Sequence, residues 1–118
     1  MAAYVPLLES AARTADVTSR QVSVYEKYEA AHIVIDVTAG SGFNLLFSVN
    51  GHDSASGKDY TILTSSDITG TGTTVLRVGP QYTAGANVAK DYLPALWSVA
   101  VTQSGGASAT YSVGASLI

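Results

Sequence analysis

The sequence of 118 residues predicts an all-β protein, an antiparallel β-sandwich of the jelly-roll or immunoglobulin-like type. Apolar and polar residues alternate with a period of two, as on strands that bury one face. Val, Ile, Thr and Tyr are common in these segments, and clusters of Gly, Ser, Asn and Asp interrupt them. The seven to eight short strands predicted in this way recur about every ten residues, which is typical of a sandwich.

The N-terminal segment carries the weakest strand signal. Residues 7–12 and 21–24 are candidate strands, yet residues 7–13 suit a short helix equally well, because Leu, Glu, Ala and Arg all favour helix. Residues 1–19 are therefore expected to form either an N-terminal arm or a first weak strand. Residues 20–118 are expected to form the sandwich domain.

The clearest strands are residues 32–38 and 43–50, which flank a glycine-rich turn, Ala-Gly-Ser-Gly. Alternation places one set of apolar side chains of the second strand on a single face, namely Phe43, Leu45, Phe47 and Val49. Two strands joined by a short glycine-containing loop usually pair with each other. The sequence therefore predicts a hairpin over residues 32–50.

Strands and polar loops alternate in the middle of the chain. Residues 51–59 are expected to be a polar hairpin loop in which Gly57 takes a positive φ. Residues 60–64 form the strand that follows this loop. The next strand, residues 73–78, ends at a Gly-Pro pair.

The last third of the sequence begins with a longer connection, residues 81–94, which has room for a helical turn at residues 88–92. Two further strands, residues 96–102 and 108–117, flank a Ser-Gly-Gly turn and are expected to close the fold as a hairpin. Trp97 alternates with valines on its strand, so its indole is expected in the core and not in a sugar-binding platform. Tyr111 and Val113 are likewise expected on one face.

Charge and composition exclude several classes of protein. Six Lys and Arg stand against nine Asp and Glu, and the basic residues form no cluster, which argues against nucleic-acid binding. Charged residues make up 13% of the sequence, against about a quarter in ordinary soluble domains, so more surface is free to be covered by a partner or by other copies. There are no cysteines, which excludes disulfides, thiolate metal sites and thiol nucleophiles.

No stretch approaches the roughly 18 apolar residues of a membrane span. The first residues lack the charged and apolar regions of a secretion signal. We therefore expect a soluble protein made in the cytoplasm, without a membrane partner.

The loop at residues 51–59 resembles a phosphate-binding loop only superficially. Five residues separate its glycines where four are needed, and Asp59 stands where Ser or Thr would hold the metal. Asp53, Asp59 and Asp67 could supply calcium ligands, but Ala55 and Gly57 break the alternation that an EF-hand loop requires. We expect the aspartates to cap backbone amides instead, and we expect no metal or cofactor.

Catalytic residues are not evident. His32 and His52 lack a metal-ligand spacing, and the sequence has no Gly-x-Ser-x-Gly elbow to support a triad of His52, Asp53 and a serine. The protein is therefore expected not to be an enzyme. Tyrosines at predicted strand ends and loops are better candidates for a contact surface; they are Tyr4, Tyr25, Tyr28, Tyr82 and Tyr92.

From about residue 28 onward the sequence resembles small proteins encoded among the head and tail genes of tailed bacteriophages and prophages. Four segments carry the resemblance: AHIVIDVTAGSG (31–42), VNGHDSASGKDYTIL (49–63), TTVLRV (73–78) and LPALWSVAVT (93–102) with the turn that follows. They cover about three-quarters of the sequence and are strand and turn patterns. The resemblance implies a β-sandwich component of the virion, assembled in the host cytoplasm.

Among such roles, the one we favour is a capsid decoration protein (a cement or minor capsid protein) on the outer surface of an HK97-type shell. Its partners would be the major capsid protein, other virion proteins or further copies of itself. Expected contact residues are Tyr4, Val5, Leu7, Leu8, Tyr82 and Tyr92, the first four on an N-terminal arm that becomes ordered against a neighbour. A virion-borne receptor- or carbohydrate-binding module and a head–tail or tail component remain alternatives.

Overall fold

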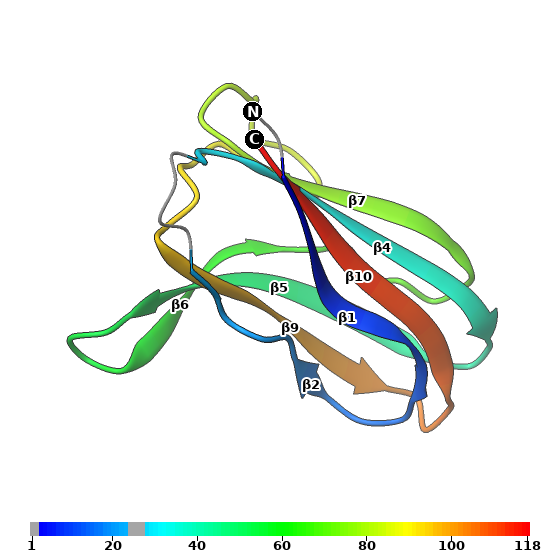
Figure 1. Ribbon diagram of the computed structural model, residues 1–118. Coiled ribbons are helices and arrows are strands. Elements are labelled where there is room, and N and C mark those ends of the chain that lie inside the picture. Colours follow the sequence, from blue (N-terminus) through cyan, green and yellow to red (C-terminus); the bar gives the residue numbers. More distant parts are fainter. Residues whose placement is uncertain (1–2, 24–27) are drawn as a thin grey trace.

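The computed structural model describes residues 3–23 and 28–118 (Figure 1). These residues form ten strands: β1 (Ala3–Arg13), β2 (Val17–Thr18), β3 (Val22–Ser23), β4 (Ala31–Gly40), β5 (Asn44–Asp53), β6 (Lys58–Thr64), β7 (Gly72–Val78), β8 (Val88–Ala89), β9 (Leu96–Ser104) and β10 (Ala109–Leu117). The first sheet has the order β1-β10-β4-β7-β8, and the second has the order β2-β9-β5-β6 with β3 also on β9. All pairings are antiparallel except β7 with β8.

The predicted all-β sandwich is confirmed, with more strands than the expected seven to eight. The two additional strands, β2 and β8, have only two residues each, which is too short for alternation to reveal. β3 also has two residues but lies within the candidate strand predicted at residues 21–24. The last strand, β10, lies between β1 and β4 in the first sheet. In an immunoglobulin domain, by contrast, the first and the last strands belong to different sheets.

The predicted hairpin over residues 32–50 is wrong. β4 and β5 lie in different sheets, and the turn between them leads from one sheet to the other. Alternation shows which face of a strand is buried, but two strands that face each other across a core have the same pattern as two neighbours in one sheet. Gly40 makes this crossing at φ 119°, where a Cβ would lie 2.5 Å from the carbonyl oxygen of Ser108. The predicted closing hairpin of β9 and β10 is wrong for the same reason.

The hairpin predicted at residues 51–59 is confirmed. β5 and β6 pair up to Asp53 and Lys58, so the turn is shorter than the predicted loop. Gly57 has φ 73°, as expected, and its amide donates to the carbonyl of Asp53. This hairpin projects from the body of the sandwich (Figure 1).

The helical turn expected at residues 88–92 is wrong, because β8 forms there instead. Asn87 takes a left-handed conformation, φ 61°, and its carbonyl accepts a hydrogen bond from the amide of Arg77 in β7. Its side-chain oxygen also accepts from the amide of Ser66. The bond from Arg77 ties the segment to the first sheet, and the bond from Ser66 ties it to the connection between β6 and β7. The backbone after Asn87 therefore pairs with β7 as a short strand.

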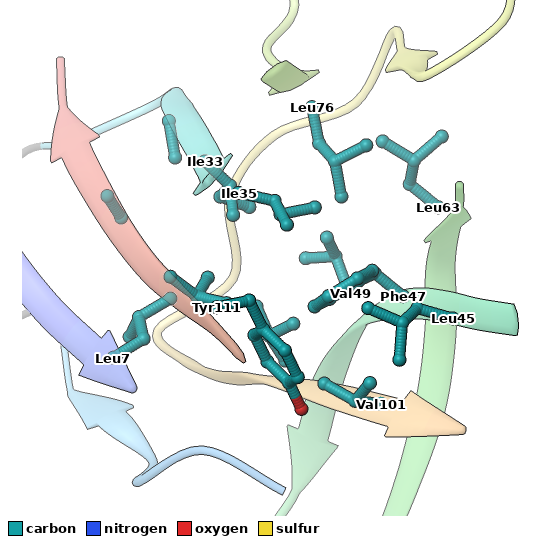
Figure 2. Packing of buried hydrophobic residues seen from close by; sticks show 14 of the residues in the cluster. Leu7, Ile33, Ile35, Leu45, Phe47, Val49, Leu63, Leu76, Val101 and Tyr111 are labelled. Carbon is teal, nitrogen blue, oxygen red and sulfur yellow. The ribbon is translucent and has the colours of Figure 1, made fainter. Parts of the chain in front are cut away.

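The core lies between the two sheets (Figure 2). The predicted inward face of β5 is confirmed, and Trp97 is fully buried as expected. Phe47 meets Tyr111 edge to face, with ring centroids 5.6 Å apart, so the two sheets are joined by an aromatic contact. No helix in the described part of the protein has the length and apolar character needed to span a membrane.

Residues 3–19 belong to the sandwich. β1 pairs with β10 along the edge of the first sheet, and β2 pairs with β9 in the second. The helical alternative for residues 7–13 is therefore wrong. The segment does not project as an arm, because Leu7 is buried in the core of its own protein.

Candidate functional site

One end of the sandwich brings together tyrosines that are far apart in the sequence. The backbone at Glu29 and Ala30 organises it: Glu29 donates to the carbonyl of Ile118, Ile118 donates to the carbonyl of Ala30, and Leu93 donates to the carbonyl of Glu29, all at 2.8–2.9 Å. Residue 118 and the loop before β9 therefore lie beside the start of β4. The two ends of the described protein also meet here, since Ala3 pairs with Leu117 (Figure 1). We call the surface formed here by Tyr4, Tyr82, Tyr92 and Ile118 the tyrosine end.

Tyr92 and Ile118 supply exposed apolar surface at this end. Tyr92 is 64% exposed and Ile118 is 43% exposed. The amide of Tyr92 donates to the carboxylate of Asp91 at 2.8 Å, which fixes the loop locally. Tyr28 lies on the same segment as Glu29 but is half-buried against the core, so it contributes less surface than expected.

Tyr82 is held in place by a side-chain hydrogen bond. Its hydroxyl lies 2.6 Å from Nε2 of His32, and which of the two donates depends on the imidazole tautomer. The ring edge lies over Gly79, where a Cβ would come within 2.8 Å of it and 2.9 Å of the Ala30 methyl. Tyr82 is thus half-buried and oriented, which lowers the entropy that binding a partner would cost.

Tyr4 lies on the outer face of the same sheet. It pairs with Ser116 of β10, and Ser116 pairs with His32 of β4, so Tyr4 and the His32–Tyr82 pair occupy one cross-strand row. Its ring lies across Gly114, where a Cβ would collide with the tyrosine oxygen. With 69% of its surface exposed, Tyr4 is the most open of the large apolar residues in the described part of the protein.

The other expected contact residues of the N-terminal segment are not on this surface. Leu7 is only 6% exposed, and Val5 and Leu8 are half-buried against the core. The expectation of a free apolar arm fails because these side chains bury apolar surface within their own protein. Tyr25, also proposed as a contact residue, lies outside the described residues.

The β5–β6 hairpin holds the polar residues considered for metal or catalytic sites. His52 Nδ1 lies 2.7 Å from the Asp59 carboxylate, so its side chain is bound to its partner across the strands and not to Asp53. Asp53 accepts from Ser56 Oγ and the amide of Ala55, which holds its pKa below the ordinary value. The predicted capping by Asp53 is confirmed, and no group of three metal-ligating side chains occurs among the described residues.

A second polar cluster lies where β1 ends. The Arg13 guanidinium donates to the carbonyls of Glu9, Ala11 and Tyr111 and stacks 4.7 Å above the Tyr111 ring. Burial raises the pKa of Tyr111, and the charge of Arg13 opposes that shift. The Tyr111 hydroxyl has no hydrogen-bond partner among the described residues. This cluster is internal and fixes β1, so it is not a contact surface.

Sequence reasoning missed three exposed apolar side chains, namely Ile118 of the tyrosine end, Tyr60 and Val34. Tyr60 of β6 is 50% exposed and lies over Gly51 of β5. Val34 is 37% exposed on the outer face of β4, next to the row that carries Tyr4. Gly51 was expected in the loop at residues 51–59, but it lies inside β5. A glycine inside a strand often marks the close approach of another group, so a longer predicted strand would have drawn attention to Tyr60.

No family model, curated protein or solved structure matches this protein in comparisons with known proteins.

Proposed function

We propose that this protein is a structural component of a tailed-phage virion that binds the outer surface of the capsid shell as a decoration protein. The tyrosine end is the surface that contacts the shell. The observation that carries the proposal is this end itself, where three tyrosines and Ile118 gather on a rigid sandwich. Tyrosine is enriched at protein interfaces because its ring buries a large area while its hydroxyl stays hydrogen-bonded.

The sparse charge of the sheets supports a role based on contact. β9 and β10 contain no charged residue, and Asp36 is the only Asp, Glu, Lys or Arg in β4. Desolvating such a surface costs little compared with burying unpaired charges. Many copies, each making modest contacts, can then coat a symmetric shell tightly.

The proposal is tested by sedimenting the purified protein with expanded shells of the matching major capsid protein that lack it. We expect the bound copies to saturate at a multiple set by icosahedral symmetry. Tyr4→Ser combined with Tyr92→Ser should weaken binding by about tenfold or more, because central aromatic residues usually dominate interface energies. Circular dichroism of the double variant should match the parent, since both side chains are mostly exposed.

Tyr60→Ser is the matched control. It also removes an exposed tyrosine that covers a glycine, but in the second sheet, and it should leave shell binding unchanged. Absence of binding to shells by the unmodified protein would overturn the proposal. A screen against bacterial surface glycans would then test the receptor-binding alternative.

A further inference from the structure

β1 is an edge strand that pairs with β10 but buries few of its side chains. Leu7 is the single buried residue among its eleven, and Arg13 is bound to β10 through the Tyr111 carbonyl at 2.8 Å. Between them, residues 9–12 are all exposed. The pairing with β10 is also interrupted by two register shifts, between Pro6 and Leu8 and between Leu8 and Ala11. An exposed edge strand with an interrupted ladder has the features of a segment that opens by local unfolding.

The pairing of β1 is the least local in the molecule. It joins the beginning of the described protein to its end, with Ala3 opposite Leu117. The contact is made by residues of β1 and β10 themselves, so the two strands need not belong to the same copy of the protein. A second copy of the protein has an identical β1, which fits the same position on β10.

The segment that follows β1 has the features of a hinge. Residues 14–16 are exposed and connect β1, in the first sheet, to β2 in the second. Gln103 of β9 holds both ends of the segment: its side-chain amide donates to the carbonyl of Arg13 at 2.6 Å, and its backbone amide donates to Asp16 at 2.8 Å. Three extended residues span about 10 Å, so only a copy lying directly alongside could be reached.

We propose that β1 is an exchangeable strand that leaves β10 of its own protomer and pairs with β10 of a neighbouring copy. Leu7, Arg13 and Tyr4 then make in the neighbour the contacts that they make in the single protomer, to the core, to Tyr111 and over Gly114. Because no contact type is lost, the exchange costs mainly the entropy of association and is driven by local concentration. This inference needs only copies of the same protein, so it stands apart from the proposed role on a shell.

The experiment uses two single-cysteine variants of a protein that has no cysteine of its own. Ala12 and Thr110 are opposite each other on β1 and β10, a spacing that a disulfide can bridge. Ala12→Cys and Thr110→Cys, the latter enlarged by a tag, are mixed, incubated and oxidised at increasing concentration. If β1 exchanges, disulfides between the two different variants should be at least about ten times as abundant as disulfides between two Ala12→Cys molecules. The reason is that pairing of β1 with β10 of the other copy places the two thiols opposite each other.

The matched control is the pair Ser48→Cys and Thr64→Cys, which are opposite each other on β5 and β6. β6 follows β5 after a short turn and cannot be exchanged alone, so this mixture should give only the level expected from random collision. Replacing residues 14–16 by a longer Gly-Ser linker should lower the Ala12–Thr110 product, because a longer hinge lets β1 fold back on its own protomer. If the mixed product does not exceed the homodimer level at any concentration, the proposal is overturned. Circular dichroism of each variant, matching the parent, shows that the comparison is between folded proteins.

Discussion

β1 and β6 are the two long edge strands, one in each sheet, and they share a local design. Each has a single buried residue, Leu7 in β1 and Leu63 in β6. In each, a partly exposed tyrosine lies across a glycine of the neighbouring strand, Tyr4 over Gly114 and Tyr60 over Gly51. An aromatic ring in this position covers backbone that a glycine would leave open to water.

The two strands differ in how their pairing is maintained. β6 follows β5 after a turn of four residues, so the short covalent connection keeps the pair together. β1 finds its partner at the other end of the sequence, and two arginines support it. Arg13 donates to the carbonyl of Tyr111 in β10, and Arg20 donates to the carbonyl of Pro6 in β1. Similar tyrosine–glycine packing thus occurs on a hairpin strand in one sheet and, in the other, on a strand whose partner is distant in sequence.

The largest expected effect comes from truncating the buried leucines. Leu7→Ala and Leu63→Ala should each lower the free energy of unfolding by about 2–4 kcal/mol, measured by urea denaturation. Only Leu7→Ala should also release its strand, because β6 remains held by its turn. Native-state hydrogen exchange should show faster exchange of the β1 amides in Leu7→Ala. Equal effects on both edge strands would contradict the distinction.

Replacing Arg13 also tests the difference between β1 and β6. Arg13→Met keeps an apolar side chain over Tyr111 but leaves three carbonyls without their donor, and should cost about 1–2 kcal/mol. The amides of β1 should exchange faster while those of β6 do not change. Lys58→Met on β6, which removes a charge from an exposed strand end, is the control and should have little effect. Unchanged β1 exchange in Arg13→Met would show that the guanidinium does not hold the strand.

A smaller effect is expected from the two tyrosines. Tyr4→Ser and Tyr60→Ser should each lower the free energy of unfolding by about 0.5–1 kcal/mol, the range of cross-strand pairs. Gly114→Ala and Gly51→Ala should be tolerated better in the matching serine background, because the added methyl no longer meets the ring. A double-mutant cycle at each edge measures this coupling. Additive effects at either edge would mean that the ring and the glycine do not interact.

The smallest effects concern pH and differ in sign between the two regions. Hydrogen bonds lower the pKa of Asp53 in the hairpin. Their contribution to the stability of the folded protein is present above the ordinary carboxyl pKa and is lost as the pH falls through the lower pKa of the folded state. Burial raises the pKa of Tyr111 beside Arg13, so stability is lost as the pH rises above about 10, where the unfolded protein ionises. In a plot of the free energy of unfolding against pH, Asp53→Asn should reduce the fall at acid pH. Tyr111→Phe should reduce the fall at alkaline pH. An unchanged fall in either variant would contradict that assignment.

The sequence predicted which face of a strand is buried better than it predicted which strands pair with each other. Alternation identified the buried side of β5, the core position of Trp97 in β9 and the shared face of Tyr111 and Val113 in β10, because the side-chain period of a strand is a local property. It did not reveal that β4 and β5 lie in opposite sheets, since facing and adjacent strands have the same pattern. It also missed β8, whose position depends on the left-handed Asn87 and its bond to Ser66.

The candidate site was predictable only in part, because strand pairing could not be read from the sequence. Tyr4, Tyr82 and Tyr92 were identified from composition and position, but their meeting at one end depends on tertiary pairing of β1, β10 and β4. Leu7 was expected on a contact surface because residues 1–19 were interpreted as an arm that becomes ordered against a neighbour. Its burial follows from the pairing of β1 with β10, which joins the segments most distant in sequence.

Hydrogen–deuterium exchange of free and shell-bound protein tests directly whether the tyrosine end is the surface that binds the shell. We expect binding to protect amides at residues 29–30, 79–93 and 116–118, and we expect the exchange of the projecting β5–β6 hairpin not to change. Protection confined to that hairpin, or to the outer face of the second sheet, would contradict the claim.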